Sequence, residues 1–397
     1  MDREREQKRW IYLDNNATTR ADEQVVKAML PYFREKYANA SAAYGPGSLS
    51  SDAVQTARGK IRAFLNAAHE SEIVFTSGGS ESNNTAIYSA LETQTGRNEI
   101  ITSAVEHASV LAVCDSLERS GRARVHRIPV DRSGNLQFDA YRAALSEKTA
   151  LVTMQWANNE TGVIFPVEVA ASMAHGAGAL FHCDAVQTAG RIPLNVVDAG
   201  VDMLSLSAHK MHGPKGIGAL YLRHGIGYSP LIRGGRQERG RRAGTENTPA
   251  IVGFGVAADL ATQSLQGEMP RVAELRDLLR RELLLRIPGA MAIGDECNLL
   301  PNTLNVAFAE VEADSVLLRL DREGIAASSG SACSTGSMEP SHVLRAMKVP
   351  FTHLRGSIRF SLSRESCEEE IRQVVSVLPG IIAELTAKSM PAEVVLD

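Results

Sequence analysis

Short apolar runs rich in β-branched side chains alternate with segments of helical periodicity between residues 70 and 225. This alternation is typical of strand–helix–strand crossover units, which build a largely parallel sheet with helices on its faces. In such sheets ligands bind beyond the carboxyl ends of the strands, so polar residues there are the first candidates for a site. The expected strands are Glu72–Thr76, Glu99–Ser103, Val125–Val130, Leu151–Gln155, Leu180–Asp184 and Met203–Ser207, and the expected helices are Glu81–Glu92, Ser109–Ser120, Asp139–Leu145 and Val167–His175.

After residue 265 the pattern changes to that of a smaller α+β unit. We expect a large domain over residues 11–265 and a small C-terminal domain over residues 266–397, with residues 1–20 packing on the small domain. The segment Leu231–Thr248, rich in Gly and Arg, is expected to be a long functional loop. In the C-terminal part the expected helices are Arg271–Arg286, Ala313–Glu323 and Cys367–Thr386, and the expected strands are Thr303–Ala309 and Ile358–Leu362.

Composition narrows the class of protein. The chain has 397 residues, 44% of them hydrophobic, and a formal charge of -4. These values are typical of a soluble globular protein and argue against a general polyanion binder. No apolar run reaches the roughly 18 residues of a membrane span, and the first ten residues are densely charged. We therefore expect neither a membrane anchor nor a secretory signal, and a cytoplasmic location.

The cysteine pattern indicates one reactive thiol. The 5 cysteines are scattered and form no CxxC pair, so neither a disulfide framework nor a zinc site on paired cysteines is expected. Cys333 lies in the small, polar stretch Ala327–Gly336, which cannot bury itself. We expect a mobile loop over residues 326–340 that carries Cys333. An incidental cysteine in a flexible loop is the alternative.

Two charged residues end successive apolar strands. Lys210 lies just past the strand ending at Ser207 and can form an imine with an aldehyde once its amine loses its proton. Asp184 can pair with a protonated pyridine nitrogen and keep such a ring an electron sink. Ser207 and His209 offer donors to a phosphate, and Gln187 offers one to a ring oxygen. Taken singly, a surface lysine and an N-cap aspartate are the alternatives.

Three further motifs also fall at strand ends. Gly79 and Ser80 form a turn into a helix, where backbone amides, a hydroxyl and the helix dipole suit a phosphate. His107 can stack on a ring face or carry protons. Asn159 can bond a ring oxygen or a carboxylate. A helix cap, a structural histidine and a turn asparagine are the respective alternatives, but the shared placement of the motifs favours one site.

Arg359 lies in a strand where alternation places it on one face with Ser357 and Ser361. Its planar fork suits bidentate binding of a carboxylate. A solvated arginine on an edge strand is the alternative.

The motifs LDNNATT, TSGGSESNN, ANNETG, DAVQ, SAHKMHGPKG, RRAGTENTP and SSGSACSTGSMEPSHVLRAM occur together in this chain. In combination they resemble the cysteine desulfurases of the nitrogen-fixation type, which are class-V aminotransferase-like enzymes of fold type I that use pyridoxal 5'-phosphate (PLP). The resemblance runs from about Ile11 to Leu385. It implies a mostly parallel seven-stranded sheet, and conversion of L-cysteine to L-alanine with transfer of the sulfur as a persulfide.

The resemblance also implies a role for each candidate residue. Lys210 would bind PLP covalently, Asp184 would pair with the ring nitrogen, and Gln187 would bond the phenolic oxygen. His107 would stack on the ring and act in catalysis, and Cys333 would carry the persulfide. Asn159 would contact the cofactor and, with Arg359, hold the substrate carboxylate. The phosphate would be held by Gly79, Ser80, Ser207 and His209, and by Thr245 of the neighbouring subunit.

The implied partners follow from these roles. A homodimer with two shared sites is expected, together with a sulfur acceptor that is a scaffold for iron–sulfur cluster assembly, possibly related to nitrogenase. No metal site is expected in the chain alone, although Cys333 could ligate a cluster shared with a scaffold. Neither nucleic acid nor a membrane is an expected partner.

Three alternatives stay open. A selenocysteine lyase, or another class-V PLP lyase or aminotransferase, would share the ring-binding residues. A metal-binding protein would use His182, Cys183, His209 and His212. A nucleic-acid binder would use Arg233, Arg236, Arg239, Arg241 and Arg242, but this cluster lacks interleaved aromatic residues, which favours a subunit interface or an acceptor-docking surface.

Overall fold

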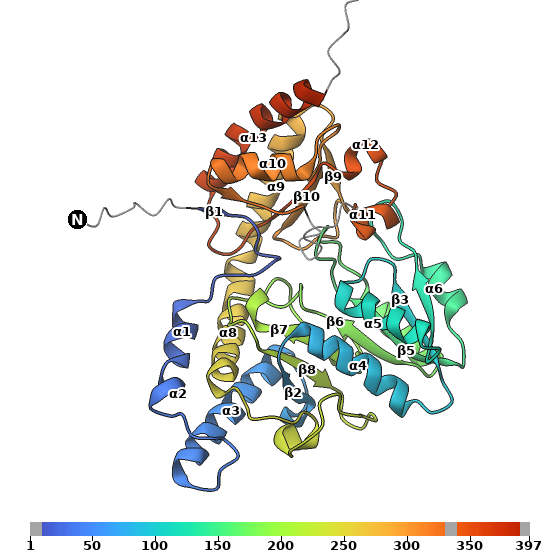
Figure 1. Cartoon of the computed structure of the whole chain (residues 1–397), viewed down its shortest axis with the longest axis vertical. Helices are drawn as coiled ribbons and strands as arrows, with labels where there is room; N and C mark the ends of the chain where they lie inside the picture. The colour runs from blue at the N-terminus through green and yellow to red at the C-terminus, as the bar shows by residue number, and fades with distance from the viewer. Residues whose placement is uncertain (1–9, 330–339, 390–397) are drawn as a thin grey trace, which may run out of the picture.

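The structure is a computed structural model that describes residues 10–329 and 340–389. Figure 1 shows a large body around one broad sheet and a second body formed mainly by the C-terminal part of the chain. Within the described residues the largest sheet has 7 strands in the order β2-β8-β7-β6-β5-β3-β4. These strands are β2 (Ile73–Thr76), β3 (Glu99–Ser103), β4 (Arg124–Ile128), β5 (Thr149–Gln155), β6 (Leu180–Asp184), β7 (Met203–Ser207) and β8 (Gly218–Leu222).

The predicted α/β fold with a mostly parallel sheet is confirmed. Only β8 runs antiparallel to its neighbours β2 and β7 among the described strands of this sheet. Strand β8 was not assigned from the sequence because it follows β7 after a short turn, with no crossover helix between them. Every residue of β5, β6 and β7 is buried, as is typical of strands covered on both faces.

Helices cover both faces of this sheet. Helices α4 (Gly79–Thr93) and α5 (Ala108–Arg119) pack on one face and share a core with Leu151. Helices α3 (Gly45–Phe64), α7 (Val167–Gly176) and α8 (Thr248–Gly267) share the other core with Val152. Successive strand residues thus enter opposite cores, as the two-residue period of a strand requires. Helices α1 (Glu23–Met29), α2 (Pro31–Arg34) and α6 (Phe138–Ala144) also belong to this body.

The second body has its own hydrophobic core. It contains residues of helices α9 (Met269–Arg286), α10 (Ala313–Arg322) and α13 (Glu368–Ser389), and also Ile11 and Leu13 from the start of the chain. An antiparallel sheet in the order β12-β10-β9 and a parallel pair β1-β11 complete it. We propose that this separate core justifies a domain boundary near residue 265. The bounds are β1 (Ile11–Tyr12), β9 (Met291–Ile293), β10 (Thr303–Ala307), β11 (Ile325–Ala326), β12 (Ser357–Ser361), α11 (His342–Ala346) and α12 (Phe351–Leu354).

None of the helices in the described ranges is both long enough and apolar enough to cross a membrane.

A buried ion pair ties the segment 231–248 to the large sheet. The Arg58 guanidinium on α3 donates to both carboxylate oxygens of Glu238 at 2.7 Å, and both side chains are 3% exposed. Glu238 also accepts from the backbone N–H of Phe75 at 2.9 Å, and Arg58 donates to the carbonyl of Ile73 at 2.7 Å. The segment is therefore held against β2, directly before the turn that opens α4.

The variant Glu238→Gln should destabilise the protein by about 3–5 kcal/mol, because it leaves the buried Arg58 cation without its anion. Urea unfolding followed by circular dichroism measures this loss. The variant Asp139→Asn removes a carboxylate from the exposed pair with Arg142 and should leave the unfolding midpoint unchanged. Equal midpoints for Glu238→Gln and the wild type would contradict the structural role of this pair.

Candidate functional site

Lys210 lies in the short 3-10 turn Ala208–Lys210 (η2) directly after β7. Its Nζ donates to the carbonyl of Ala17 at 2.8 Å and to that of Asn16 at 2.5 Å. Two carbonyls of the N-terminal segment thus hold the amine at the carboxyl end of the sheet, where the sequence places a ligand.

Asp184 is the last residue of β6, and its register places it beside Gln155 of β5 and Ser205 of β7. One carboxylate oxygen, Oδ2, accepts from Nδ2 of Asn83 at 2.7 Å, and Oδ1 accepts from the backbone N–H of Val186 at 3.0 Å. These two donors fix the orientation of the carboxylate, which is 7% exposed.

Lys210 and Asp184 line one cavity of about 260 Å³. A cavity of this size, with polar groups on several walls, suits a small cofactor. Predicted site residues in its lining are Gly79, Ser80, His107, Asn159, Asp184, Gln187, Ser207, His209 and Lys210. The structure therefore gathers these strand-end motifs at one place.

One end of the cavity suits a phosphate. Gly78 precedes α4 with φ +157°, where a side chain is strained, and a Cβ on Gly79 would lie 2.7 Å from Cγ2 of Val186. Backbone N–H groups at the start of this helix therefore approach the cavity closely, together with the hydroxyls of Ser80 and Ser207. Burial, with Lys210 and other cations nearby, lowers the pKa of His209 to about 4. His209 is therefore neutral at pH 7 and offers a hydrogen bond rather than a charge.

His107 is the N-cap residue of α5, and its Nδ1 accepts from the backbone N–H of Ser109 at 3.1 Å. The ring lines the same cavity as Asp184 and Lys210. Its predicted stacking on a ring and its catalytic role both stay predictions.

Gln187 is held by a buried arginine, Arg191, which was not among the residues predicted from the sequence. The Arg191 guanidinium donates to the side-chain oxygen Oε1 of Gln187, and to its carbonyl at 2.6 Å. Since Oε1 is taken, the amide nitrogen is the group that donates elsewhere, here to the carbonyl of Asn16 at 3.1 Å. Burial, with a contribution from Arg359, lowers the pKa of Arg191 to about 9. The four-residue spacing from Gln187 was the available signal, but sequence alone does not indicate that this arginine is buried, because most arginines are exposed.

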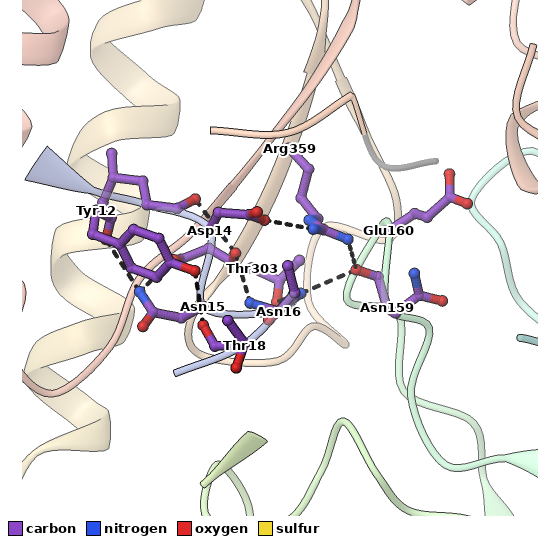
Figure 2. A network of polar contacts seen from close by, with 12 residues as sticks. Tyr12, Asp14, Asn15, Asn16, Thr18, Asn159, Glu160, Thr303 and Arg359 are labelled. Carbon is purple, nitrogen blue, oxygen red and sulfur yellow. Dashed lines mark hydrogen bonds and ion pairs between the residues drawn. The ribbon is translucent and has the colours of Figure 1, made fainter. Parts of the chain in front are cut away.

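Arg359 lies on β12 beside the cavity rather than in its lining. Its side chain is 2% exposed, which contradicts the alternative of a solvated edge-strand arginine. One terminal nitrogen donates to the carbonyl of Asn159 at 3.1 Å, and the other pairs with Asp14 at 2.7 Å (Figure 2). The strand stays buried although it ends its sheet, because Ser328 and Asp14 pair with its free edge.

Two further residues that were predicted for the site are not placed at this cavity. Thr245 is exposed and is not among the described residues that line the cavity. Cys333 lies outside the residues that the structure describes.

Side chains of the alternative metal-binding and nucleic-acid-binding sites already have hydrogen-bond or ion-pair partners within the protein. Both ring nitrogens of His182 are hydrogen-bonded, to Thr153 at 2.8 Å and Ser205 at 2.9 Å, and burial lowers its pKa to about 3. Among the described residues no group of three or more His, Cys, Asp or Glu side chains is arranged to hold a metal ion. In the arginine cluster, Arg233 pairs with Glu92 and Arg242 with Glu81.

A buried carboxyl group directly precedes His107 in the chain. Glu106 is fully buried and accepts from the hydroxyl of Ser103 at 2.5 Å. Burial, reinforced by the nearby charge of Asp184, raises the pKa of Glu106 to about 8. Glu106 was not predicted as a site residue, although it precedes His107, because sequence alone does not distinguish a buried glutamate from an exposed one.

The variant Glu106→Gln tests this burial through pH. Between the ordinary pKa of 4.5 and the raised value of about 8, only the unfolded chain ionises Glu106, so wild-type stability falls as pH rises. Glutamine has no such proton, and the stability of the variant relative to the wild type should rise by up to ~1.4 kcal/mol per pH unit across this window. Urea unfolding at several pH values from pH 5 to pH 8 measures this change in relative stability. A stability difference between the variant and the wild type that stays constant with pH would contradict the prediction.

Comparison with known proteins agrees with this geometry. The family described as Aminotransferase class-V matches residues 11–374. A protein of Gluconacetobacter diazotrophicus named cysteine desulfurase is 58% identical over 96% of this chain and 95% of its own length. The cysteine desulfurase NifS of Azotobacter vinelandii is 50% identical over 94% of this chain and 93% of its own. A solved structure of a NifS-like protein superposes with a TM-score of 0.89 at 37% identity, covering 95% of this chain and 100% of that one.

The family match spans most of the chain, and the relatives align over nearly their full lengths. The chain therefore belongs to the class-V aminotransferase family of fold type I, and within it to the cysteine desulfurases of the NifS type.

Proposed function

We propose that the chain is a PLP-dependent cysteine desulfurase that converts L-cysteine to L-alanine and passes the sulfur, as a persulfide on Cys333, to an acceptor. The observation that carries this proposal is the convergence of Lys210 and Asp184 on one cavity that also has a helix N-terminus in its wall. Relatives named cysteine desulfurase, 50% and 58% identical over nearly the whole chain, support the choice of reaction.

The residues present fit PLP. The helix start at Gly79 and Ser80, with Ser207 and His209, offers neutral donors to a phosphate, and Asp184 offers an anion to the ring nitrogen. Nε2 of Gln155, which also lines the cavity, is buried without a hydrogen-bond partner among the described residues. When bound, PLP supplies an aldehyde for an amine and a ring that withdraws electrons from the substrate Cα.

The protein then has to move protons and hold charges. In our proposal Lys210 first anchors the cofactor and, once the substrate amine has replaced it, takes the proton from the substrate Cα at its Nζ. Asp184 keeps a proton on the ring nitrogen, and its own orientation is set by Asn83 and Val186. Gln187, oriented by Arg191, donates to the phenolic oxygen.

The sulfur step requires a thiolate. In this step the Cys333 thiolate forms an S–S bond to the substrate sulfur while the substrate Cβ–S bond breaks. The electron pair of the broken bond stays on Cβ, and protonation of the carbon skeleton then gives alanine. His107 handles the proton of the substrate thiol. Two other cysteines are poor candidates, because burial raises the pKa of Cys114 to about 12 and that of Cys183 well above its ordinary value.

The assembly around this reaction is part of the same proposal. Arg359 and Asn159 hold the substrate carboxylate. The exposed position of Thr245 suits a residue that reaches the phosphate of a second subunit, so we propose a homodimer with shared sites. A scaffold for iron–sulfur cluster assembly, possibly serving nitrogenase, is the proposed sulfur acceptor, and the cytoplasm is the proposed location.

The variant Cys333→Ser should abolish alanine and sulfide production from L-cysteine while keeping the absorbance band of the cofactor bound to Lys210. The reason is that this change removes the sulfur acceptor and leaves the ring-binding residues intact. Alanine is quantified by chromatography, and the band is read from an absorbance spectrum of the purified holoprotein.

The matched control is Cys297→Ser, which removes an exposed cysteine that is not among the described residues lining the cavity. It should keep wild-type turnover. Normal alanine production by Cys333→Ser would show that the thiol has been wrongly assigned.

A further inference from the structure

We propose that Asp14 is a positioning residue for substrate recognition, which holds the Arg359 guanidinium in the orientation that receives the α-carboxylate of an amino acid. This inference rests on the proposed function, since it assumes that Arg359 binds that carboxylate. Asp14 belongs to the LDNNATT motif, but no role was assigned to it from the sequence.

The Arg359 guanidinium is held from two sides (Figure 2). Its NH2 nitrogen pairs with Oδ1 of Asp14 at 2.7 Å, and its NH1 nitrogen donates to the carbonyl of Asn159 at 3.1 Å. The arginine side chain is 2% exposed, whereas that of Asp14 is 20% exposed. The aspartate therefore lies on the more open side of a buried cation, next to a residue of the cavity wall.

Asp14 is fixed independently of this ion pair. The backbone on either side of it pairs with β12, through Ser361 N–H to the carbonyl of Leu13 at 2.7 Å and Asn15 N–H to the carbonyl of Ser361 at 3.1 Å. Two residues after Asp14, the side chain of Asn16 donates to Thr303 at 2.9 Å and to the carbonyl of Asn159 at 3.0 Å. A carboxylate anchored in this way can orient a flexible arginine instead of following it.

The guanidinium keeps donors that a ligand can use. The Nε atom of Arg359 is buried and has no hydrogen-bond partner among the described residues. Because Nε and a terminal nitrogen form one edge of the planar fork, that edge suits a carboxylate, which accepts two parallel hydrogen bonds. Asp14 accepts from NH2 through Oδ1, so it orients the guanidinium without occupying all of its hydrogen-bond donors.

Asp14 has two opposing effects on an incoming carboxylate. Its charge repels the ligand, and its hydrogen bond keeps the buried guanidinium pointed at the ligand. We expect orientation to dominate, because within the described residues Asp14 is the carboxylate within ion-pair distance of Arg359. Without it, this desolvated cation would turn toward other acceptors.

The test compares two amines that differ in the carboxylate. L-Alanine and ethylamine both react with the bound cofactor of the holoprotein, and the resulting absorbance change gives a dissociation constant for each without any sulfur transfer. The variant Asp14→Ala should weaken L-alanine binding about tenfold or more, equivalent to ~1.4 kcal/mol, and leave ethylamine binding within about twofold. Asp14→Asn should lose less, because its amide oxygen still accepts from the guanidinium.

The matched control is Asp22→Ala. Asp22 pairs with Arg364, its side chain is 19% exposed, and it also joins the N-terminal segment to the second body, but it is outside the cavity lining. This variant should bind L-alanine like the wild type. Thermal unfolding of each variant checks that it is folded, and Asp14→Asn preserves the test if Asp14→Ala does not fold.

Equal weakening for both amines would overturn the proposal, because it would indicate a general structural defect. Unchanged or tighter L-alanine binding by Asp14→Ala would also overturn it, since Asp14 would then only compete with the substrate. A wild-type protein that does not prefer L-alanine to ethylamine would refute the carboxylate site on Arg359, and Asp14's role with it. Cysteine turnover, measured separately, tests the proposed function.

Discussion

The parallel register of β5, β6 and β7 is the constraint on which the site depends. It places Gln155, Asp184 and Ser205 side by side at one end of a sheet that is buried on both faces. A shift of one residue would turn Asp184 into the opposite core, because side chains alternate along a strand. The two hydrophobic cores therefore determine which side of β6 carries the carboxylate, and the turn after β7 brings Lys210 to the same cavity.

The N-terminal segment connects this sheet to the second body. Its residues pair with β12, and two of its carbonyls accept from Lys210. The carbonyl of Asn16 also accepts from Gln187, while its side chain reaches Thr303 and Asn159. Backbone carbonyls are suited to hold Lys210 and Gln187, because they accept hydrogen bonds and orient the donors without adding a charge to a buried site. Lys210 and Arg359 are thereby linked through one short stretch of chain.

Buried charges around the cavity are compensated in different ways. Arg359 has a carboxylate partner in Asp14, whereas Arg191 donates to carbonyl and amide oxygens, and burial lowers the pKa of Arg191. Glu106 avoids a buried charge altogether, because burial raises its pKa so far that it keeps its proton at neutral pH. Charges in such surroundings are costly unless something specific holds them. Their concentration around one cavity is typical of a site that binds a charged ligand.

The sequence by itself determined the mostly parallel sheet, the strand ends at which polar motifs fall, and the family, because hydrophobic periodicity and motif spacing are local properties of a chain. It also identified most of the residues that line the cavity, from Gly79 to Lys210. Only the tertiary structure decided that Arg359 is buried beside Asp14, that Arg191 orients Gln187, and that Glu106 is buried within reach of the charge of Asp184. These contacts join residues far apart in the chain or depend on burial, and burial is set by how the cores pack rather than by any short stretch of sequence.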